Sequence, residues 1–326
     1  MKLISVITPC FNEEANVEEL YLRVRGALAR VGRYAYEHIF IDNHSRDKTV
    51  AILKKIASRD TNVRIIVNAR NFGHVRSPMH AFLETSGDAV IGLAADLQDP
   101  PEMIEEMIAK WEDGYAMVLC IKETSQEHGL MFRARRLYYR FVQRLSSIET
   151  FENFTGFGLY DRKVVEAVRS FGDAYPYFRG MIAEIGLPHF KLIYDQPRRK
   201  HGVTKNNFYT LYDLAMLGIT NLSKVPLRLV TFSGFLGAML CGLVGMGYLV
   251  YKLLYWNNFS VGTAPLVIGL FFLGSVQLVS MGILGEYVGA IYTQVLKRPY
   301  VIEQERVNFE FEPGMPLQEG DFGTRL

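Results

Sequence analysis

The sequence predicts an α/β domain with a mostly parallel sheet, followed by a membrane-anchoring region. Short β-branched segments alternate with helical stretches in the first part of the chain, and two long apolar segments occur near its end. The 326 residues are 49% hydrophobic and 21% charged, which excludes general disorder. The net charge is only +2, so a dedicated nucleic-acid-binding protein is disfavoured.

Five apolar segments are predicted to form the strands of the sheet. They are LISVIT from Leu3, HIFID from His38, VRIIVN from Val63, AVIGLAA from Ala89 and AMVLCI from Ala116. Helical stretches such as Glu14–Val31 and Pro101–Glu112 separate them. This alternation is typical of parallel sheets with helices on both faces, in which ligands bind at the carboxyl ends of the strands.

The segments from Leu227 to about Tyr255 and from Ala264 to about Gly285 are predicted to cross a membrane. Each holds roughly twenty apolar or small residues, enough to span the hydrocarbon core as a helix. Two buried helices of a soluble protein are the alternative, but such helices seldom stay apolar on every face. Basic residues flank the pair and are missing from the loop Trp256–Thr263, which predicts a multi-pass inner (plasma) membrane protein with its N-terminal α/β domain in the cytoplasm.

Two further segments adjoin the predicted spans. Residues 205–225 have one apolar face with basic ends, which predicts an amphipathic helix on the inner leaflet; packing on the sheet is the alternative. Residues 301–326 are predicted to be a polar cytoplasmic tail that packs on a neighbouring subunit or is disordered. The three separated cysteines argue against a disulfide framework or a structural zinc site and fit a reducing compartment.

Polar clusters follow three of the predicted strands. They are Thr8–Glu14 after the first strand, Asp42–Thr49 after the second and Asp96–Glu102 after the fourth. Each cluster alone is consistent with a turn and a helix cap. Because parallel strands end at one edge of a sheet, the three clusters together predict a single ligand-binding cleft.

The string DLQDPPE at Asp96–Glu102, the segment RKHGVTK at Arg199–Lys205 and two spans ending at Gly285–Tyr287 carry a family resemblance. Together they resemble the family 2 glycosyltransferases, and more narrowly the polyisoprenyl-phosphate glycosyltransferases such as bactoprenol glucosyltransferases and dolichyl-phosphate mannose synthases. The resemblance covers roughly residues 1–300. It implies a GT-A, Rossmann-like catalytic domain over residues 1–204, the interfacial helix at 205–225, two transmembrane helices within 226–300 and the tail at 301–326.

The resemblance also implies roles for individual residues. Asp96 and Gln98 would bind Mg²⁺ or Mn²⁺, hard cations that favour oxygen ligands, and the cation would stabilise the leaving diphosphate. Asp161 matches a separate family position that opens a helix; it is the second catalytic candidate, with its contribution left open. The nucleotide site would consist of residues at the three strand ends: Pro9, Phe11, Glu13, Asp42, Asn43 and Asp96.

Basic residues are implied to bind the phosphate of the lipid acceptor or of the donor. The candidates are Arg133, Arg136, Arg199, Thr204 and Lys205. Two alternatives stay open. Arg199 and Lys205 are also consistent with inner-leaflet anchors, and Arg133 and Arg136 with a solvated helix face.

The chain departs from the family pattern at three places. It has Asp42-Asn43 where relatives usually have two aspartates, Ala94-Ala95-Asp96 for Asp-Ala-Asp, and Gly156 in place of an acidic residue. A phosphate acceptor with a second pKa of ~6 is already ionised at neutral pH, so losing the last carboxylate is compatible with activity. The amide of Asn43 suits uracil, which favours UDP over GDP.

The sequence therefore predicts a membrane-anchored, inverting glycosyltransferase that uses a nucleotide sugar, a polyprenyl phosphate acceptor and a divalent cation, and that forms a homo-oligomer. The alternatives are a catalytically silent relative that binds a nucleotide or lipid, and a GDP-mannose-using synthase. A two-span channel has little support because the spans carry few polar residues, such as Gln277.

Overall fold

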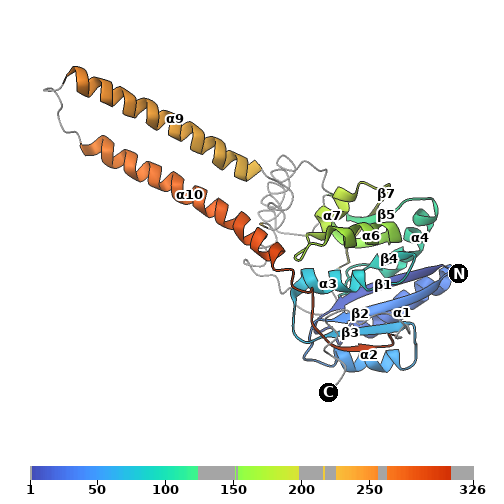
Figure 1. The fold of residues 1–326 in the computed structure, drawn as a ribbon. Coiled ribbons are helices and arrows are strands. Elements are labelled where there is room, and N and C mark those ends of the chain that lie inside the picture. Colours follow the sequence, from blue (N-terminus) through green and yellow to red (C-terminus); the bar gives the residue numbers. More distant parts are fainter. Residues whose placement is uncertain are drawn as a thin grey trace.

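The computed structural model describes residues 2–123, 151, 153–197, 216, 225–255 and 263–309. These residues form an eight-stranded sheet with helices on both faces, from which two long helices extend side by side (Figure 1). The strand order is β7-β5-β6-β4-β1-β2-β3-β8. The strands are β1 Leu3–Cys10, β2 Ala35–Asp42, β3 Val63–Asn68, β4 Ala89–Gly92, β5 Met117–Lys122, β6 Phe154–Asp161, β7 His189–Tyr194 and β8 Glu303–Val307.

The five predicted strands are confirmed as β1 to β5. Four strand pairs are parallel, namely β1 with β2, β1 with β4, β2 with β3, and β5 with β7. The remaining pairs are antiparallel, because β6 runs against β4 and β5, and β8 runs against β3. The predicted α/β class with a mostly parallel sheet is therefore confirmed.

Two apolar cores hold helices against the two faces of the sheet. The helices of the domain are α1 Val17–Val31, α2 Thr49–Ala57, α3 Gly73–Leu83, the 3₁₀ turn Pro101–Met103, α4 Ile104–Glu112, α6 Arg162–Phe171 and α7 Phe178–Ile185. One core packs α1, α2 and α4 on the sheet, and the other packs α3, α6 and α7. In α1, Leu20, Val24 and Leu28 lie at a spacing of four and are buried, so the apolar face decides which side meets the sheet.

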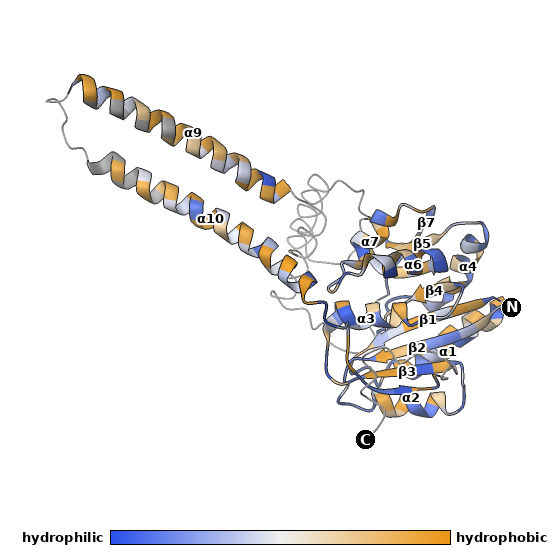
Figure 2. Cartoon of the chain, viewed as in Figure 1, coloured by the Kyte–Doolittle hydropathy of each residue, from blue (hydrophilic) through white to orange (hydrophobic). Residues whose placement is uncertain are grey.

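The helices α9 Val225–Leu254 and α10 Thr263–Val295 extend away from the sheet (Figure 1). Figure 2 shows apolar residues along both, and large side chains such as Phe232 and Leu278 are 70% and 71% exposed. Within the described residues, one segment, Phe272–Val295, is long and apolar enough to cross a membrane, and Val225–Cys241 is a shorter apolar helix. The prediction of two spans is thus supported for one helix and not shown for the other.

The tail differs from its prediction. Residues 303–307 were expected to pack on a neighbouring subunit or to be disordered, but they form β8 on the edge of β3 in the same chain. The side chain of Asn308 donates hydrogen bonds of 3.0 and 2.8 Å to the carbonyls of Ala57 and Val63, which holds the end of β8 in place. The strand was missed because an edge strand of charged residues has no apolar alternation to reveal it.

The return of β8 defines where α10 joins the domain. Glu303 lies opposite Asn68, the last residue of β3, and Val307 lies opposite Ile65. The chain therefore comes from α10 to the carboxyl edge of the parallel strands. The predicted interfacial helix at 205–225 falls almost entirely outside the described residues and stays a prediction.

Candidate active site

The three polar clusters meet at one edge because β4, β1 and β2 are parallel neighbours. The backbone N–H of Asn12 donates to Ser45 Oγ at 2.8 Å, and the N–H of Arg46 donates to Asn12 Oδ1 at 2.8 Å. The N–H of Glu13 donates to Thr49 Oγ1 at 2.9 Å. The loops after β1 and β2 are therefore bonded to each other, while the single ligand-binding cleft stays a prediction.

Each cluster contains one non-glycine residue with a left-handed backbone. The φ angles are 56° at Asn12, 66° at His44 and 60° at Leu97. This conformation is unfavourable for residues with a Cβ and is often found at functional sites. Leu97 is only 3% exposed, so burial of its side chain helps to hold the turn between Asp96 and Gln98. Three such residues at one edge make it a candidate functional edge.

Asp96 and Gln98 form a compact turn that suits a hard cation. The N–H of Gln98 donates to Asp96 Oδ1 at 3.2 Å, and Gln98 Nε2 points to the carbonyl of Pro197 at 3.4 Å. No group of three or more His, Cys, Asp or Glu that would hold a metal occurs within the described residues. Mg²⁺ in phosphate-transferring sites often has one or two protein ligands and fills its shell with phosphate and water. The donor set therefore fits a substrate-bridging cation rather than a metal cage.

Asp99 is a buried carboxyl group to which the sequence assigned no role. Its Oδ2 accepts from the N–H of Ala94 at 3.0 Å, and its Oδ1 accepts from the hydroxyl of Tyr194 at 3.1 Å. Burial raises the pKa of Asp99 to about 6, and the neighbouring charge of Asp96 acts in the same direction. Asp99 thus ties the loop that carries Asp96 to β7. Its place in the string DLQDPPE was the only sequence signal for it.

Asp42 closes the turn at the end of β2. The carboxyl group is fully buried and accepts a hydrogen bond of 2.8 Å from the N–H of Ser45 and another from its hydroxyl. Burial raises the pKa of Asp42, although the bonds from Ser45 oppose that effect. A contact between Asp42 and the nucleotide stays a prediction.

The side chain of Asn43 is directed at the loop after β3. Its Nδ2 donates to Asn71 Oδ1 at 2.9 Å and to the carbonyl of Gly73 at 3.2 Å. Its Oδ1 accepts from the N–H of Phe72 at 2.8 Å and from Asn68 Nδ2 at 3.2 Å. An amide has two donor hydrogens and two acceptor lone pairs, so all four are used. The predicted bonding of this amide to uracil is not supported. The argument that Asn43 favours UDP over GDP is therefore withdrawn.

Pro9, Phe11 and Glu13 lie at the predicted edge. Pro9 is paired with Ile41 near the end of β1, and Phe11 follows that strand. Glu13 lies in the turn before α1, and its carbonyl accepts from the N–H of Val17, the first residue of that helix, at 3.1 Å. Their role as the floor of a nucleotide site stays a prediction.

Asp161 lies at the opposite edge of the sheet. It is paired with Ala89, the first residue of β4, whereas Asp96 follows the end of β4. Its carboxylate caps α6 by accepting from the N–H of Lys163 at 2.9 Å, and it accepts from Trp111 Nε1 at 2.7 Å. This place does not support the predicted catalytic role and indicates a structural one.

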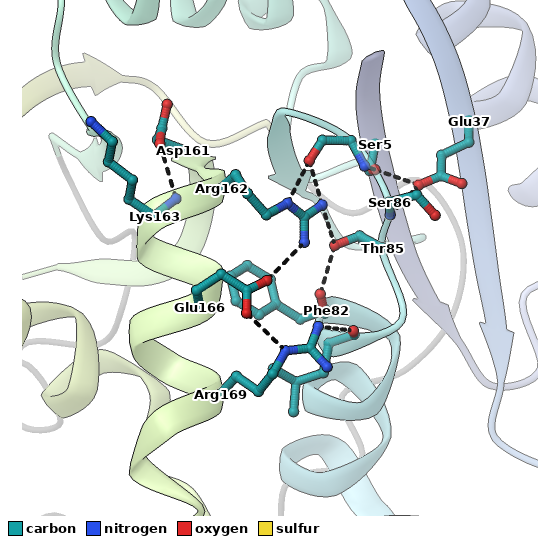
Figure 3. Close-up of polar contacts among 12 residues, drawn as sticks. Ser5, Glu37, Phe82, Thr85, Ser86, Asp161, Arg162, Lys163, Glu166 and Arg169 are labelled. Atoms are coloured by element: carbon teal, nitrogen blue, oxygen red, sulfur yellow. Dashed lines mark hydrogen bonds and ion pairs between the residues drawn. The ribbon is translucent and has the colours of Figure 1, made fainter. Parts of the chain in front are cut away.

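Figure 3 shows the polar contacts of Arg162, the residue next to Asp161. Arg162 Nε donates to the carbonyl of Gly87 at 2.7 Å, and its guanidinium lies 3.7 Å from Glu166. Ser5 and the N–H of Ser86 both donate to Glu37. The network joins β1, β2 and α6 at the amino edge. Sequence reasoning could not place Asp161 here, because the antiparallel direction of β6 is not visible in local patterns.

Two glycines, Gly156 and Gly158, lie in β6, in the segment where the family resemblance leads one to expect an acidic residue at position 156. Gly156 has a φ of +104°, which disfavours any side chain, and its carbonyl would lie 3.5 Å from a Cβ on Gly92 at the end of β4. A Cβ on Gly158 would meet the carbonyl oxygen of Val118 at 2.3 Å. The local backbone is therefore built for glycine at both positions.

The predicted phosphate-binding residues lie outside the described part of the chain. These are Arg133, Arg136, Arg199, Thr204 and Lys205. Their roles stay predictions.

A mostly parallel sheet with strained polar loops at its carboxyl edge is the arrangement of nucleotide-binding α/β enzymes. Comparison with known proteins is more specific. Residues 5–169 match the family model "Glycosyl transferase family 2". The chain is 32% identical to an uncharacterized glycosyltransferase of Synechocystis over 95% of this chain and 97% of the relative. It is 34% identical to a prophage-derived bactoprenol glucosyl transferase of Shigella flexneri over 92% of this chain and 97% of the relative.

The chain therefore belongs to glycosyl transferase family 2 and is a glycosyltransferase. Among solved structures, it is similar to glucosyl-3-phosphoglycerate synthase from Mycobacterium tuberculosis, crystallised with Mn²⁺, UDP and phosphoglyceric acid. That likeness has a TM-score of 0.45 and 19% identity, and it covers 67% of this chain and 76% of the other.

Proposed function

We propose that the protein transfers a hexose from a nucleotide sugar to a polyprenyl phosphate at the cytoplasmic face of the inner membrane, with α9 and α10 both crossing the bilayer. Relatives named bactoprenol glucosyl transferases match nearly the whole chain, including these helices. The predicted homo-oligomer stays a prediction.

The direction of α10 is the observation that carries this proposal. The chain passes from α10 into β8, whose first residue, Glu303, lies opposite Asn68 at the carboxyl end of β3. The same edge holds the turn of Asp96 and Gln98. If α10 crosses the membrane, the edge that carries Asp96 faces the bilayer surface, where the phosphate of a lipid acceptor lies.

The transfer exchanges one bond to the anomeric carbon for another. A phosphate oxygen of the lipid forms a bond to that carbon from the face opposite the donor, while the bond to the donor diphosphate breaks and its electron pair leaves with the diphosphate. The acceptor is already ionised at neutral pH, so it needs positioning rather than a general base. This agrees with the glycine at position 156.

Asp96 and Gln98 would hold the divalent cation. When bound, the cation would stabilise the negative charge that builds up on the leaving diphosphate. The bond from the N–H of Gln98 fixes one oxygen of Asp96, and the buried Leu97 fixes the turn. The Asp96 carboxylate would therefore be oriented before substrate binds, which is what electrostatic stabilisation of a transition state requires.

The test uses membranes that contain the protein, with polyprenyl phosphate and radiolabelled UDP-glucose or GDP-mannose. We expect an organic-extractable, acid-labile product from UDP-glucose, its loss in Asp96→Ala, and its retention in Asp161→Asn. Product from GDP-mannose alone would show that the donor is GDP-mannose and that the protein is a mannose synthase. If every donor stabilised the purified protein against heat but none gave product, the chain would be the catalytically silent relative.

A further inference from the structure

The most unusual charge arrangement outside the candidate active site lies where α10 meets the catalytic domain. We propose that Arg70, Arg76 and Arg298 form a binding surface for the phosphate groups of anionic membrane lipids, which seats the domain on the bilayer. The proposal rests on the membrane insertion of α10 in the proposed function. It concerns bulk phospholipid and not the lipid acceptor.

Two of the arginines are arranged around one buried ring. Phe72 is 8% exposed, and the guanidinium carbons of Arg70 and Arg76 lie 4.1 and 5.5 Å from its centroid. Guanidinium groups held near an aromatic ring lose less freedom when they bind, and their planar N–H donors match the oxygens of a phosphate. Phe72 is itself fixed, because its N–H donates to Asn43 Oδ1 at 2.8 Å. The donors are therefore preorganised.

The cluster is attached to the chain that leaves α10. Arg76 donates to the carbonyl of Pro299, and the N–H of Ala69 donates to the carbonyl of Ile302 at 2.9 Å. Arg298 lies three residues after Val295, the last residue of α10. A membrane crossed by α10 would bring its headgroups to this level.

The positive charge of this surface is not neutralised inside the described part of the protein. None of its three arginines makes an ion pair there, and Arg70 bonds only to the carbonyl of Asn71. Burial lowers the pKa of Arg76, and the charges of Arg70 and Arg298 lower it further. The Nε of Arg76 is buried without a hydrogen-bond partner. By contrast, seven other arginines are paired with carboxylates: Arg23, Arg30, Arg33, Arg64, Arg162, Arg169 and Arg306.

An anionic bilayer supplies the missing counter-charge. The negative surface potential of such a membrane attracts each nearby arginine. For each arginine, the equilibrium constant for seating the domain on the membrane rises by about fivefold. Three arginines that converge at the base of a membrane helix add these effects. The surface therefore controls how the domain lies on the membrane, while α9 and α10 keep it attached.

Hydrogen exchange of the full-length protein in nanodiscs tests the proposal. Three samples are compared. The nanodiscs consist of phosphatidylcholine alone in the first and of phosphatidylcholine with phosphatidylglycerol in the second; in the third, inorganic phosphate is added to the buffer around phosphatidylcholine nanodiscs. We expect slower exchange across residues 69–77 and 296–303 with phosphatidylglycerol only, by about fivefold or more. The combined variant Arg70→Gln, Arg76→Gln, Arg298→Gln should lose this protection.

Arg59→Gln is the matched control, because Arg59 is exposed at the amino end of β3 and should leave the protection unchanged. Equal exchange in neutral and anionic nanodiscs would overturn the proposal. Protection by inorganic phosphate would instead show a soluble-anion site. If the combined variant lost stability in neutral nanodiscs, the single variant Arg298→Gln, on an exposed residue, would be compared and should lose part of the protection. Failure of the protein to enter nanodiscs at all would count against the proposed function itself.

Discussion

The two edges of the central sheet are built in opposite ways. At the amino edge, charged groups are satisfied within the protein: Glu37 is paired with Arg64, and Arg162 with Glu166 and the carbonyl of Gly87. At the carboxyl edge, left-handed residues such as Leu97 are held in place, and Arg76 lies close to Arg70 and Arg298 rather than to a carboxylate. The difference separates an edge that stabilises the fold from the edge at which we propose that ligands bind.

The largest effect should come from a glycine at the amino edge. A Cβ on Gly87 would lie 2.6 Å from Ser5 Oγ and 2.8 Å from the carbonyl of Leu3. We expect Gly87→Ala to lower the free energy of unfolding by about 3 kcal/mol, because backbone must move to make room. Chemical denaturation measures the loss. Gly73→Ala is the control at the carboxyl edge; a Cβ there meets nothing within 4 Å, so only its φ of 86° opposes the change and the cost should be about 1 kcal/mol.

Asp161→Ala should separate stability from catalysis. The variant loses the cap on α6 and the bond from Trp111, so unfolding free energy should fall by about 2 kcal/mol. Turnover per folded molecule should not change, because Asp161 lies at the edge opposite Asp96. Asp161→Asn keeps a capping oxygen and should lose less. A drop in turnover without a drop in stability would restore the catalytic role of Asp161.

Asn43→Asp should weaken the loop after β3. A carboxylate in this place would face Asn71 Oδ1 and the carbonyl of Gly73 with no hydrogen to donate. We expect a loss of about 1.5 kcal/mol and faster hydrogen exchange in residues 69–73. Asn153→Asp, on an exposed residue just before β6, serves as the control and should have little effect. Unchanged exchange in the loop would show that the amide does not brace it.

The smallest effect should be a dependence on pH at β8. Partial burial of Glu303 opposes ionisation, but hydrogen bonds from His80 and Arg306 lower its pKa to about 2, with Glu84 also facing Arg306. A lowered pKa means that Glu303 adds stability above about pH 4.5 and that this stability is lost as pH falls towards 2. We expect Glu303→Gln to cost about 1 kcal/mol near pH 7 and nothing at pH 2.

Thermal unfolding of both proteins across this pH range measures the difference. Glu305→Gln is the control, because its ion pair with Lys54 is more than 40% exposed at both side chains and contributes little. A constant difference between Glu303→Gln and the unchanged protein at all pH values would contradict the assignment.

Local patterns were sufficient for the parts of the fold in which neighbours in sequence are neighbours in space. The strands β1 to β5 have apolar runs, and the three polar clusters follow from the rule that parallel strands end together. The patterns failed where distant pairing decides the outcome. The register of β6 puts Asp161 at the amino edge. Groups in and after the end of β3 bond to all the donor and acceptor positions of the Asn43 side chain.

The attachment of β8 to β3 has a mechanical consequence for the whole molecule. A catalytic domain linked to α10 by a flexible connection alone would rotate freely relative to that helix. Here the segment after α10 pairs with β3 over several residues. Rotation of the domain relative to α10 would therefore require this strand pairing to break. β8 also covers the edge of β3, on which a strand of another chain would otherwise dock. One short strand thus restricts the orientation of the domain and blocks edge-to-edge association.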